Sequence, residues 1–167
     1  MRYQLKTANK IKVSKSSIGG RGVFATEDIS EGEIIEECHF IISGCSKEME
    51  NKELARYAFA IFLDNELSPE DNEKISFKIR LLSMFEDENV TDNLISFIKD
   101  MGYENLDNLF NSATVLGHGM IYNHSKEYNV NYECDLKNML FEYRANTNIK
   151  KGKELLINYG AHYWKNK

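Results

Sequence analysis

The chain has 167 residues and a net charge of −5, from 21 basic and 26 acidic side chains. This length is typical of a single domain that buries a core without disulfide or metal staples. An acidic surface fits poorly against nucleic acid phosphates, so we expect no direct nucleic acid partner. It is compatible with basic proteins, although net charge also serves solubility. No apolar run reaches the ~20 residues of a membrane span, so we expect no membrane partner.

The cysteines are odd in number, and none forms a Cys-x-x-Cys pair: they are Cys38, Cys45 and Cys134. This argues against a disulfide framework and a zinc cluster, and it predicts no metal site. The opening segment, residues 1–12, is polar and basic and lacks the apolar core of a secretory signal peptide. We expect a protein that is not exported by such a peptide. Its place is then the cytoplasm, or a host nucleus if the source is a virus or an intracellular pathogen.

The first third of the chain is predicted to form strands and turns. Ile11 and Val13 alternate with lysines, and a second short strand, Val23–Ala25, follows a loop over Ser16–Gly22. The best strand candidate is Ile34–Ile42, after a turn at Asp28–Gly32. Alternate positions of this strand share one face, which is apolar except for one acid: Ile34, Glu36, Cys38, Phe40 and Ile42.

The middle of the chain is predicted to be helical. A first helix has an apolar stripe at helical spacing, namely Leu54, Tyr57, Ala58, Ile61 and Phe62. Ser68-Pro69-Glu70-Asp71 is a helix start with a capping hydroxyl and proline in the first turn. The helix that it opens carries Ile75, Ile79 and Leu82. Thr91-Asp92 begins a third helix, whose apolar residues are Leu94, Ile95, Ile98 and Met101, and Gly102 ends it.

The last third returns to strands at Met139–Tyr143 and Leu155–Ile157. Two short segments, Ile29-x-x-Gly32 and Ile149-x-x-Gly152, each precede a strand, which we interpret as two similar turns and not as a duplication. The order strands, helices, strands predicts the α+β class with short, mostly antiparallel sheets. The whole chain, 1–167, would be one domain, with a helical insertion at about 64–112.

Three short motifs carry the chemistry of the sequence. The first is Gly20-Arg21-Gly22, which is either a tight turn before a strand or a loop that approaches a cofactor with its main chain. It is not a dinucleotide fingerprint, because no G-x-G-x-x-G occurs and no helix follows. The second is Asn123-His124-Ser125, whose side chains are suited to fixing a polar ligand or to plain structural hydrogen bonding.

The third motif is Glu-Leu-Leu-Ile-Asn-Tyr-Gly, from Glu154 to Gly160. Its apolar core is predicted to be a buried strand that ends at Tyr159. A phenol at that place is either a core tyrosine or a group that orients a substrate amine.

In this order and in a chain this small, the three motifs resemble the SET-domain protein lysine methyltransferases, in particular the compact single-domain type of viruses and bacteria. The resemblance covers about Ile11 to Trp164. It implies a SET fold with a C-terminal pseudoknot that brings Asn123 and Tyr159 together, and it implies S-adenosyl-L-methionine as cofactor. The site residues that it implies are Gly20, Arg21, Gly22, Asn123 and His124 for the cofactor, and Tyr159 for catalysis and cofactor contact.

Other positions follow the family pattern less closely. Lys126 and Tyr128 stand where the family often has cysteine and proline, and Ile157 stands at a substrate-side position that is commonly aromatic and influences the number of methyl groups added. By resemblance, Trp164 packs on the adenine, and Tyr163 and Tyr57 line the lysine channel. Plain core packing is the alternative for all three.

The sequence therefore predicts an S-adenosylmethionine-dependent protein-lysine N-methyltransferase whose substrate is a lysine in a basic protein or peptide, such as a histone or histone-like protein. Two alternatives stay open: a methyltransferase for a non-histone protein, for example a ribosomal one, and an inactive SET-like module that binds a protein partner. The oligomeric state is also open, a homodimer included, because apolar helical stripes serve cores and interfaces alike.

Overall fold

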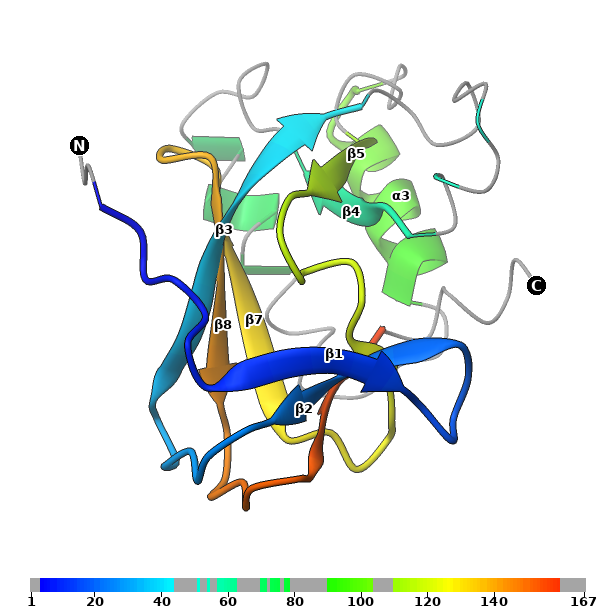
Figure 1. The fold of residues 1–167 in the computed structure, drawn as a ribbon. Coiled ribbons are helices and arrows are strands. Elements are labelled where there is room, and N and C mark those ends of the chain that lie inside the picture. The colour runs from blue at the N-terminus through cyan, green and yellow to red at the C-terminus, as the bar shows by residue number, and fades with distance from the viewer. Residues whose placement is uncertain are drawn as a thin grey trace. The chain divides into compact units, whose positions relative to one another are not determined.

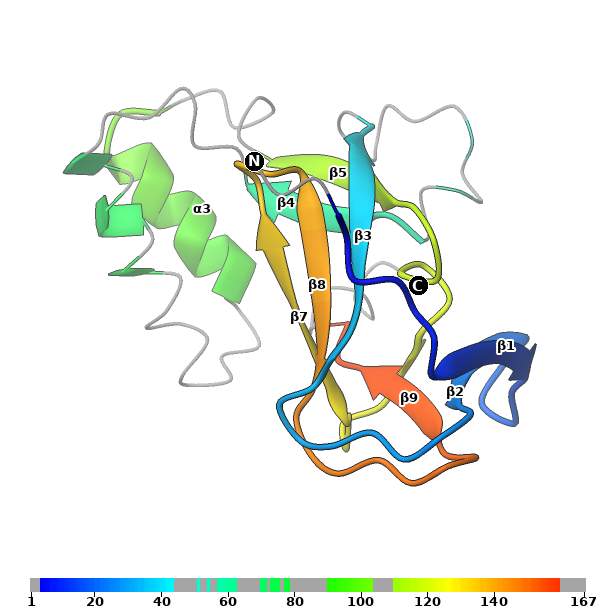
Figure 2. The same cartoon turned by 60° about the vertical axis from the view of Figure 1, so that its left-hand side comes forward.

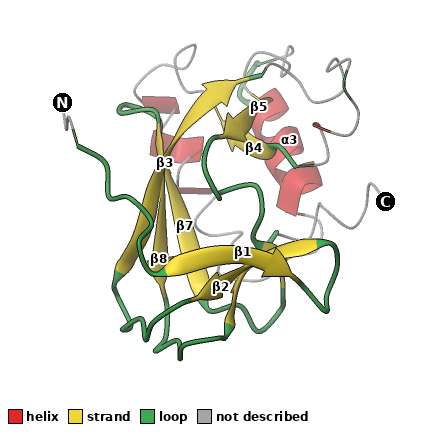
Figure 3. Cartoon of the chain, in the orientation of Figure 1, coloured by secondary structure: helices red, strands yellow, loops and turns green. Residues whose placement is uncertain are grey.

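The computed structural model describes residues 4–43, 51, 54, 57–62, 70, 71, 73–75, 77, 78, 90–103 and 110–159. The chain divides into two compact units. The first unit combines Met1–Phe59 with Ser112–Tyr159, and the second combines Ala60–Asn111 with Gly160–Lys167. Strands dominate the described part of the first unit (Figure 3).

The strands are, in chain order, β1 (Ile11–Lys15), β2 (Arg21–Ala25), β3 (Ile34–Ile42), β4 (Phe59–Phe62), β5 (Phe110–Val115), β6 (Asn123–His124), β7 (Val130–Asp135), β8 (Leu140–Ala145) and β9 (Glu154–Ile157). The helix α3 spans Val90–Asp100. All strand pairs but one are antiparallel among those whose register is described; the exception is β6 with β9. The predicted α+β class with short, mostly antiparallel sheets is confirmed.

The first sheet has the order β1-β2-β9-β6. The hairpin β1–β2 is paired from Ile11↔Ala25 to Lys15↔Arg21, and Figure 1 shows the two strands side by side. Strand β9 comes from the far end of the chain and lies between β2 and β6, next to β2 in Figure 2. Its buried residues Leu155 and Ile157 point into the core, which explains why an apolar strand of only four residues is held here.

In the first unit, β5, β3, β8 and β7 follow one another in a second sheet. Its core is aromatic. Phe141 on β8 packs edge-to-face on Phe40 with 5.3 Å between the ring centroids, and its ring centroid lies 5.0 Å from that of Phe59. Edge-to-face and offset pairs at such distances are the favoured geometries of aromatic rings. The antiparallel pairing of β3 with β8 and of β8 with β7 fixes which side chains of these strands face the core.

The two similar turns predicted from the sequence are confirmed, and they also contact each other. Ile29 and Ile149 form an isolated antiparallel bridge, with N–H···O distances of 2.9 and 2.8 Å. Gly32 and Gly152 both have positive φ, 78° and 84°, which only glycine adopts without strain. The matching sequences therefore build a pair of turns that joins the entry to β3 to the entry to β9.

Within the second unit, α3 buries Leu94 and Ile98 and ends at Asp100, two residues before Gly102, whose φ is 92°. This confirms the predicted third helix and its stop at Gly102, although the helix begins at Val90, one residue before the predicted Thr91. Glu70 and Asp71 are helical as predicted, whereas Ser68, Pro69, Ile79 and Leu82 lie outside the described residues. None of the described helices is both long and apolar enough to cross a membrane.

The predicted helix through Leu54–Phe62 is wrong over its last part, because Phe59–Phe62 is strand β4. The stripe was misleading since four apolar residues in succession fit a short buried strand as well as a helix face. Tyr57 does not pack in a core either, because 56% of its surface is exposed. The strands β5 and β7 were not predicted: β7 carries mostly polar side chains, which hides its alternation.

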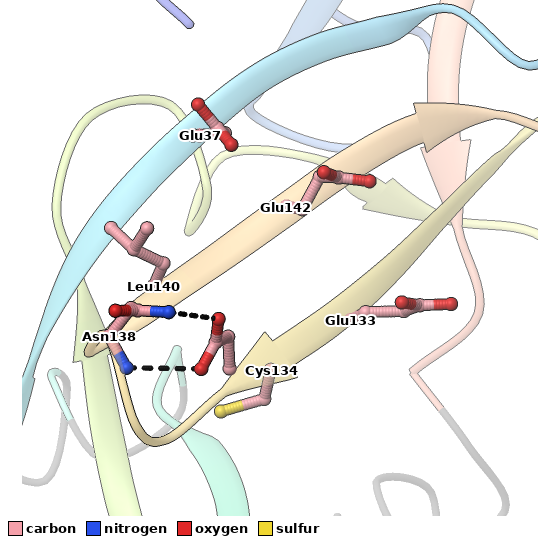
Figure 4. A pocket seen from close by; sticks show the side chains of 7 residues that line it. Glu37, Glu133, Cys134, Asn138, Leu140 and Glu142 are labelled. Atoms are coloured by element: carbon pink, nitrogen blue, oxygen red, sulfur yellow. Dashed lines mark hydrogen bonds between the residues drawn. The ribbon is translucent and has the colours of Figure 1, made fainter. Parts of the chain in front are cut away.

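Three glutamates stand directly opposite one another across β3, β8 and β7. Glu37 pairs with Glu142, and Glu142 pairs with Glu133, so their side chains share one face of the sheet. With Cys134, Asp135, Asn138 and Leu140 they line a hollow of about 290 Å³ (Figure 4). Arg144 donates to Glu142, and the Lys6 amide donates to Glu37 at 2.7 Å, which offsets part of the repulsion.

We expect Glu133→Lys to raise the free energy of unfolding by about 0.5 kcal/mol, because a cation replaces one of two like charges opposite Glu142. Urea denaturation at low salt measures the change, and added salt should reduce it. Glu31→Lys makes the same charge change on an exposed turn residue and is the control. Equal stabilisation by both variants would contradict a local origin in the glutamate row.

Candidate functional site

Strand β9 brings the three sequence motifs together. On one side, Val23↔Leu155 and Phe24↔Glu154 pair it with the strand that follows the glycine loop. On its other side, Asn123↔Leu156 and His124↔Ile157 pair it with the Asn-His strand β6. Since β9 leads directly to Tyr159, the glycine, Asn-His and tyrosine motifs meet at one sheet.

The two glycines of the first motif serve different needs. Gly20 has φ of 52° and ends a tight turn in which its carbonyl accepts from the Ser16 amide at 3.1 Å. Gly22 is buried against side chains: a Cβ there would lie 2.0 Å from Glu154 Oε1 and 2.9 Å from Asn123 Nδ2. One glycine is therefore required by backbone conformation and the other by space.

Glu154 and Asn123 form a polar clasp behind Gly22. Asn123 Nδ2 donates to Glu154 Oε1 at 2.8 Å and to the Arg21 carbonyl at 3.1 Å. The second carboxylate oxygen of Glu154 accepts from the buried Ser16 hydroxyl at 2.9 Å. The clasp thus holds both ends of the glycine loop against β9 and β6, a role that the sequence did not reveal for Ser16 or Glu154.

Asn129 holds the other edge of β9. Its side-chain nitrogen Nδ2 donates to the Glu154 carbonyl at 2.9 Å, and its side-chain oxygen Oδ1 accepts from the Leu156 main-chain amide at 2.8 Å. A side-chain amide that makes both bonds imitates a neighbouring strand. The partners of Asn129 were not predictable from the sequence.

Tyr159 is held at both ends. Its hydroxyl donates to the main-chain carbonyl of Tyr122 at 2.5 Å, and its own amide donates to His124 Nδ1 at 3.0 Å. The rings of His124 and Tyr159 are 5.4 Å apart. The structure therefore brings the Asn-His motif and the C-terminal tyrosine into direct contact.

The ring of His124 is biased toward its neutral form. Desolvation lowers its pKa below the ordinary value of 6.5, and the nearby positive charge of Lys126 lowers it further. A neutral ring is what the contact with Tyr159 requires, because Nδ1 accepts a hydrogen bond there and a protonated ring cannot accept one.

The remaining predicted site residues are placed as follows. Arg21 is exposed, and Ile157 is completely buried in β9. Tyr163 and Trp164 lie outside the described residues.

A hollow of about 650 Å³ is lined by Gly20, Arg21 and the β1 residues Val13, Ser14 and Lys15. Among the described residues, no three histidine, cysteine or acidic side chains are arranged to hold a metal ion.

Comparison with known proteins points to one family. Residues 20–160 match the SET domain, a span that contains all three motifs. No curated protein matches the chain at a significant level.

Three solved structures have a similar fold. A Plasmodium falciparum protein described as a candidate histone methyltransferase has a TM-score of 0.54 and 26% identity, over 95% of this chain and 99% of that one. An active polycomb repressive complex 2 in the basal state gives a TM-score of 0.55 at 19% identity, over 92% of this chain and 15% of the other. A humanized Chaetomium thermophilum polycomb repressive complex 2 bound to the inhibitor GSK126 gives 0.51 at 20% identity, with the same coverage.

We expect Gly22→Ala to lower the free energy of unfolding by about 1–3 kcal/mol, because its methyl group would collide with Glu154 and Asn123. Gly19→Ala is the matched control, since no atom lies within 4 Å of a Cβ at that position. Urea denaturation of both variants measures the difference. A Gly22→Ala protein as stable as Gly19→Ala would contradict the close approach.

The stability that His124 contributes should depend on pH. Because its pKa is lower in the folded state than the unfolded value of 6.5, this contribution is fully present above pH 6.5. It is lost as the pH falls through the lower, folded-state pKa. Denaturation from pH 7.5 to 5 should therefore show the stability difference between wild type and His124→Gln shrinking. A difference that stays constant or grows on acidification would contradict the assignment.

Proposed function

Because this chain belongs to the SET-domain family, we propose that it is a protein-lysine N-methyltransferase that uses S-adenosyl-L-methionine. The observation that carries the proposal is the position of Tyr159, whose hydroxyl is fixed by the Tyr122 carbonyl while its amide is fixed by His124. The further prediction that it is of the compact viral or bacterial type stays a prediction.

The residues around the glycine loop suit the proposed cofactor. The hollow beside Gly20 and Arg21 is within the usual size range of ligand sites, and glycines let a ligand approach the main chain closely. We propose that Gly20, Arg21 and Gly22 bind with main-chain groups and that Asn123 and His124 flank them. When bound, S-adenosylmethionine supplies an electrophilic methyl group on a sulfonium. The packing of Trp164 on the adenine and the place of Tyr163 in the lysine channel stay predictions, because both residues lie outside the described part of the chain.

The proposed role of Tyr159 is orientation and not proton removal. A hydroxyl that donates its only proton to the Tyr122 carbonyl acts toward a substrate as an acceptor. Its oxygen can therefore receive an N–H of the substrate amine and set the direction of the nitrogen lone pair. Fixing a nucleophile in line with its target is a large part of catalysis in such transfers.

The amine must lose its proton before it can attack. With a pKa near 10.4, deprotonating lysine at pH 7 costs about 4–5 kcal/mol. Desolvation of the amine and the positive charge that the bound cofactor would carry both lower the pKa of the amine, and its proton leaves to solvent. The site can therefore favour the neutral amine without a carboxylate base.

We propose a basic protein tail as the substrate, of the histone or histone-like kind. The net charge of −5 makes the protein electrostatically compatible with such a partner. The description of the Plasmodium protein supports the same substrate class. Ile157 stands at the position that influences the number of methyl groups added. Mass spectrometry of the product would measure that number.

The decisive experiment is transfer of labelled methyl from S-adenosylmethionine to a panel of basic proteins that includes core histones and ribosomal proteins. We expect Tyr159→Phe to lower turnover by about 100-fold or more while cofactor affinity changes less than about threefold, because only the orienting hydroxyl is lost. Tyr132→Phe, which removes a hydroxyl from strand β7, is the control and should retain turnover.

The outcomes separate the competing functions. Near wild-type turnover in a folded Tyr159→Phe protein would contradict the catalytic role of Tyr159. Label on ribosomal proteins alone would move the substrate to the non-histone class. Cofactor binding by calorimetry without label on any protein would count against the proposed substrate class, and absence of cofactor binding would favour an inactive protein-binding module.

A further inference from the structure

A buried carboxylate that belongs to none of the three motifs touches the segment before Asn123. Glu36 lies on β3 with 3% of its surface exposed. The register of β3 against β8 shifts between Ile34 and Glu36, and beyond this shift Glu36 pairs with Tyr143 and Cys38 pairs with Phe141. The acid that interrupts the apolar face of this strand in the sequence therefore shares that face with Cys38, where it meets polar partners.

Glu36 has a partner for each oxygen. The Tyr122 hydroxyl donates to Oε1 at 2.7 Å, and His118 Nδ1 lies 3.1 Å from Oε2. A buried carboxylate is stable only when its oxygens are hydrogen-bonded, so removing a partner or the carboxylate disturbs the whole group. Burial and the neighbouring Glu36 raise the pKa of Tyr122 well above its ordinary value, which keeps this hydroxyl a donor at neutral pH.

The segment that carries both partners packs very closely on β3 and β5. Gly117 has φ of 81°, and a Cβ there would lie 3.2 Å from Cys38 Sγ. A Cβ on Gly119 would lie 2.4 Å from a methyl carbon of Val115 and 2.7 Å from the Tyr143 hydroxyl. Because close-packed groups move only together, the position of this segment depends on the contacts beneath it.

Tyr122 connects the carboxylate to the candidate catalytic residue. Its ring stacks on Tyr143 at 4.8 Å with an interplanar angle of 9°, and its hydroxyl binds Glu36. A ring held by stacking and by a hydrogen bond at its tip fixes the main chain to which it is attached. The carbonyl of that same residue accepts the hydrogen bond from the Tyr159 hydroxyl.

We propose that Glu36 is a positioning residue, which orients Tyr122 so that the Tyr122 carbonyl holds the hydroxyl of Tyr159 in place for methyl transfer. The catalytic part of this proposal rests on the proposed function. The structural link from Glu36 through Tyr122 to Tyr159 is independent of it.

The kinetic test compares Glu36→Ala with Glu36→Gln and with the matched control Glu37→Ala. Glu37 is the next residue of β3 and is also buried, with 8% exposed, but its carboxylate accepts from the Lys6 amide. We expect Glu36→Ala to lower kcat at least ~10-fold with both KM values within about twofold, because geometry and not binding is disturbed. Glu36→Gln should recover most of kcat, since its amide oxygen can accept from Tyr122. Glu37→Ala should retain wild-type kcat.

A double variant separates positioning from general weakening of the fold. If Glu36 acts through the Tyr159 hydroxyl, Glu36→Ala should lower the single-turnover rate no further in a Tyr159→Phe background. Equal losses of kcat in Glu36→Ala and Glu37→Ala would overturn the proposal. The proposal would also be overturned if the loss of single-turnover rate in the double variant equalled the product of the losses in the two single variants.

A spectroscopic measurement decides the structural link whether or not the protein methylates anything. In protein labelled with ¹³C at tyrosine Cζ, the Tyr159 signal is assigned by its disappearance in Tyr159→Phe, and it reports on the hydroxyl hydrogen bond. We expect Glu36→Ala to shift this signal and Glu37→Ala to leave it in place. An unmoved signal in a folded Glu36→Ala protein overturns the proposal. Absence of methyl transfer by the wild type, with the signal shifted, would instead refute only the proposed function.

Discussion

The carboxylate of Glu154 is the contact on which the rest of the site depends. It accepts from Asn123 and from Ser16, two residues of segments that are far from it in sequence, and these bonds hold the glycine loop and β6 against β9. A partly buried charge needs such donors, and here the donors are the groups that must be brought together. Gly22 makes the arrangement sterically feasible, since any side chain there would occupy the place of the carboxylate.

The same arrangement determines where Tyr159 lies. Strand β9 ends two residues before it, so the pairing of β9 with β2 and β6 delivers the tyrosine to the Asn-His segment. Its hydroxyl and its amide are then fixed by a main-chain carbonyl and by a histidine ring. A phenol held in this way is preorganised, which is the property expected of a group that orients a substrate rather than reacting with it.

The two sheets of the first unit contribute different parts to the proposed enzyme. The sheet β1-β2-β9-β6 carries the residues proposed for cofactor binding and catalysis. Strand β3 of the other sheet supplies Glu36, whose carboxylate accepts a hydrogen bond from the Tyr122 hydroxyl. The opposite face of that second sheet carries the row of like charges at Glu37, Glu142 and Glu133, which weakens the pairing of its strands. Adjacent residues of one strand, Glu36 and Glu37, therefore belong to two separate electrostatic environments.

Elements whose pattern is local could be predicted from the sequence alone. The strand Ile34–Ile42, the helix that stops before Gly102 and the two similar turns that contain Gly32 and Gly152 all follow from alternation, capping and glycine positions. The sequence also supplied the motifs, so the candidate residues Gly20, Asn123 and Tyr159 could be named before their positions were known. The segment through Phe59 was misassigned because a short apolar run does not distinguish a strand from a helix.

Contacts between distant segments could not be predicted in this way, because they depend on how the whole chain folds. Glu154 binds Ser16 and Asn123, Asn129 imitates a strand beside β9, and Glu36 reaches Tyr122. All of these contacts depend on the order of the strands in the sheets. Local propensity acts over a few residues, whereas these contacts exist only once the chain has closed loops of 25 to 138 residues.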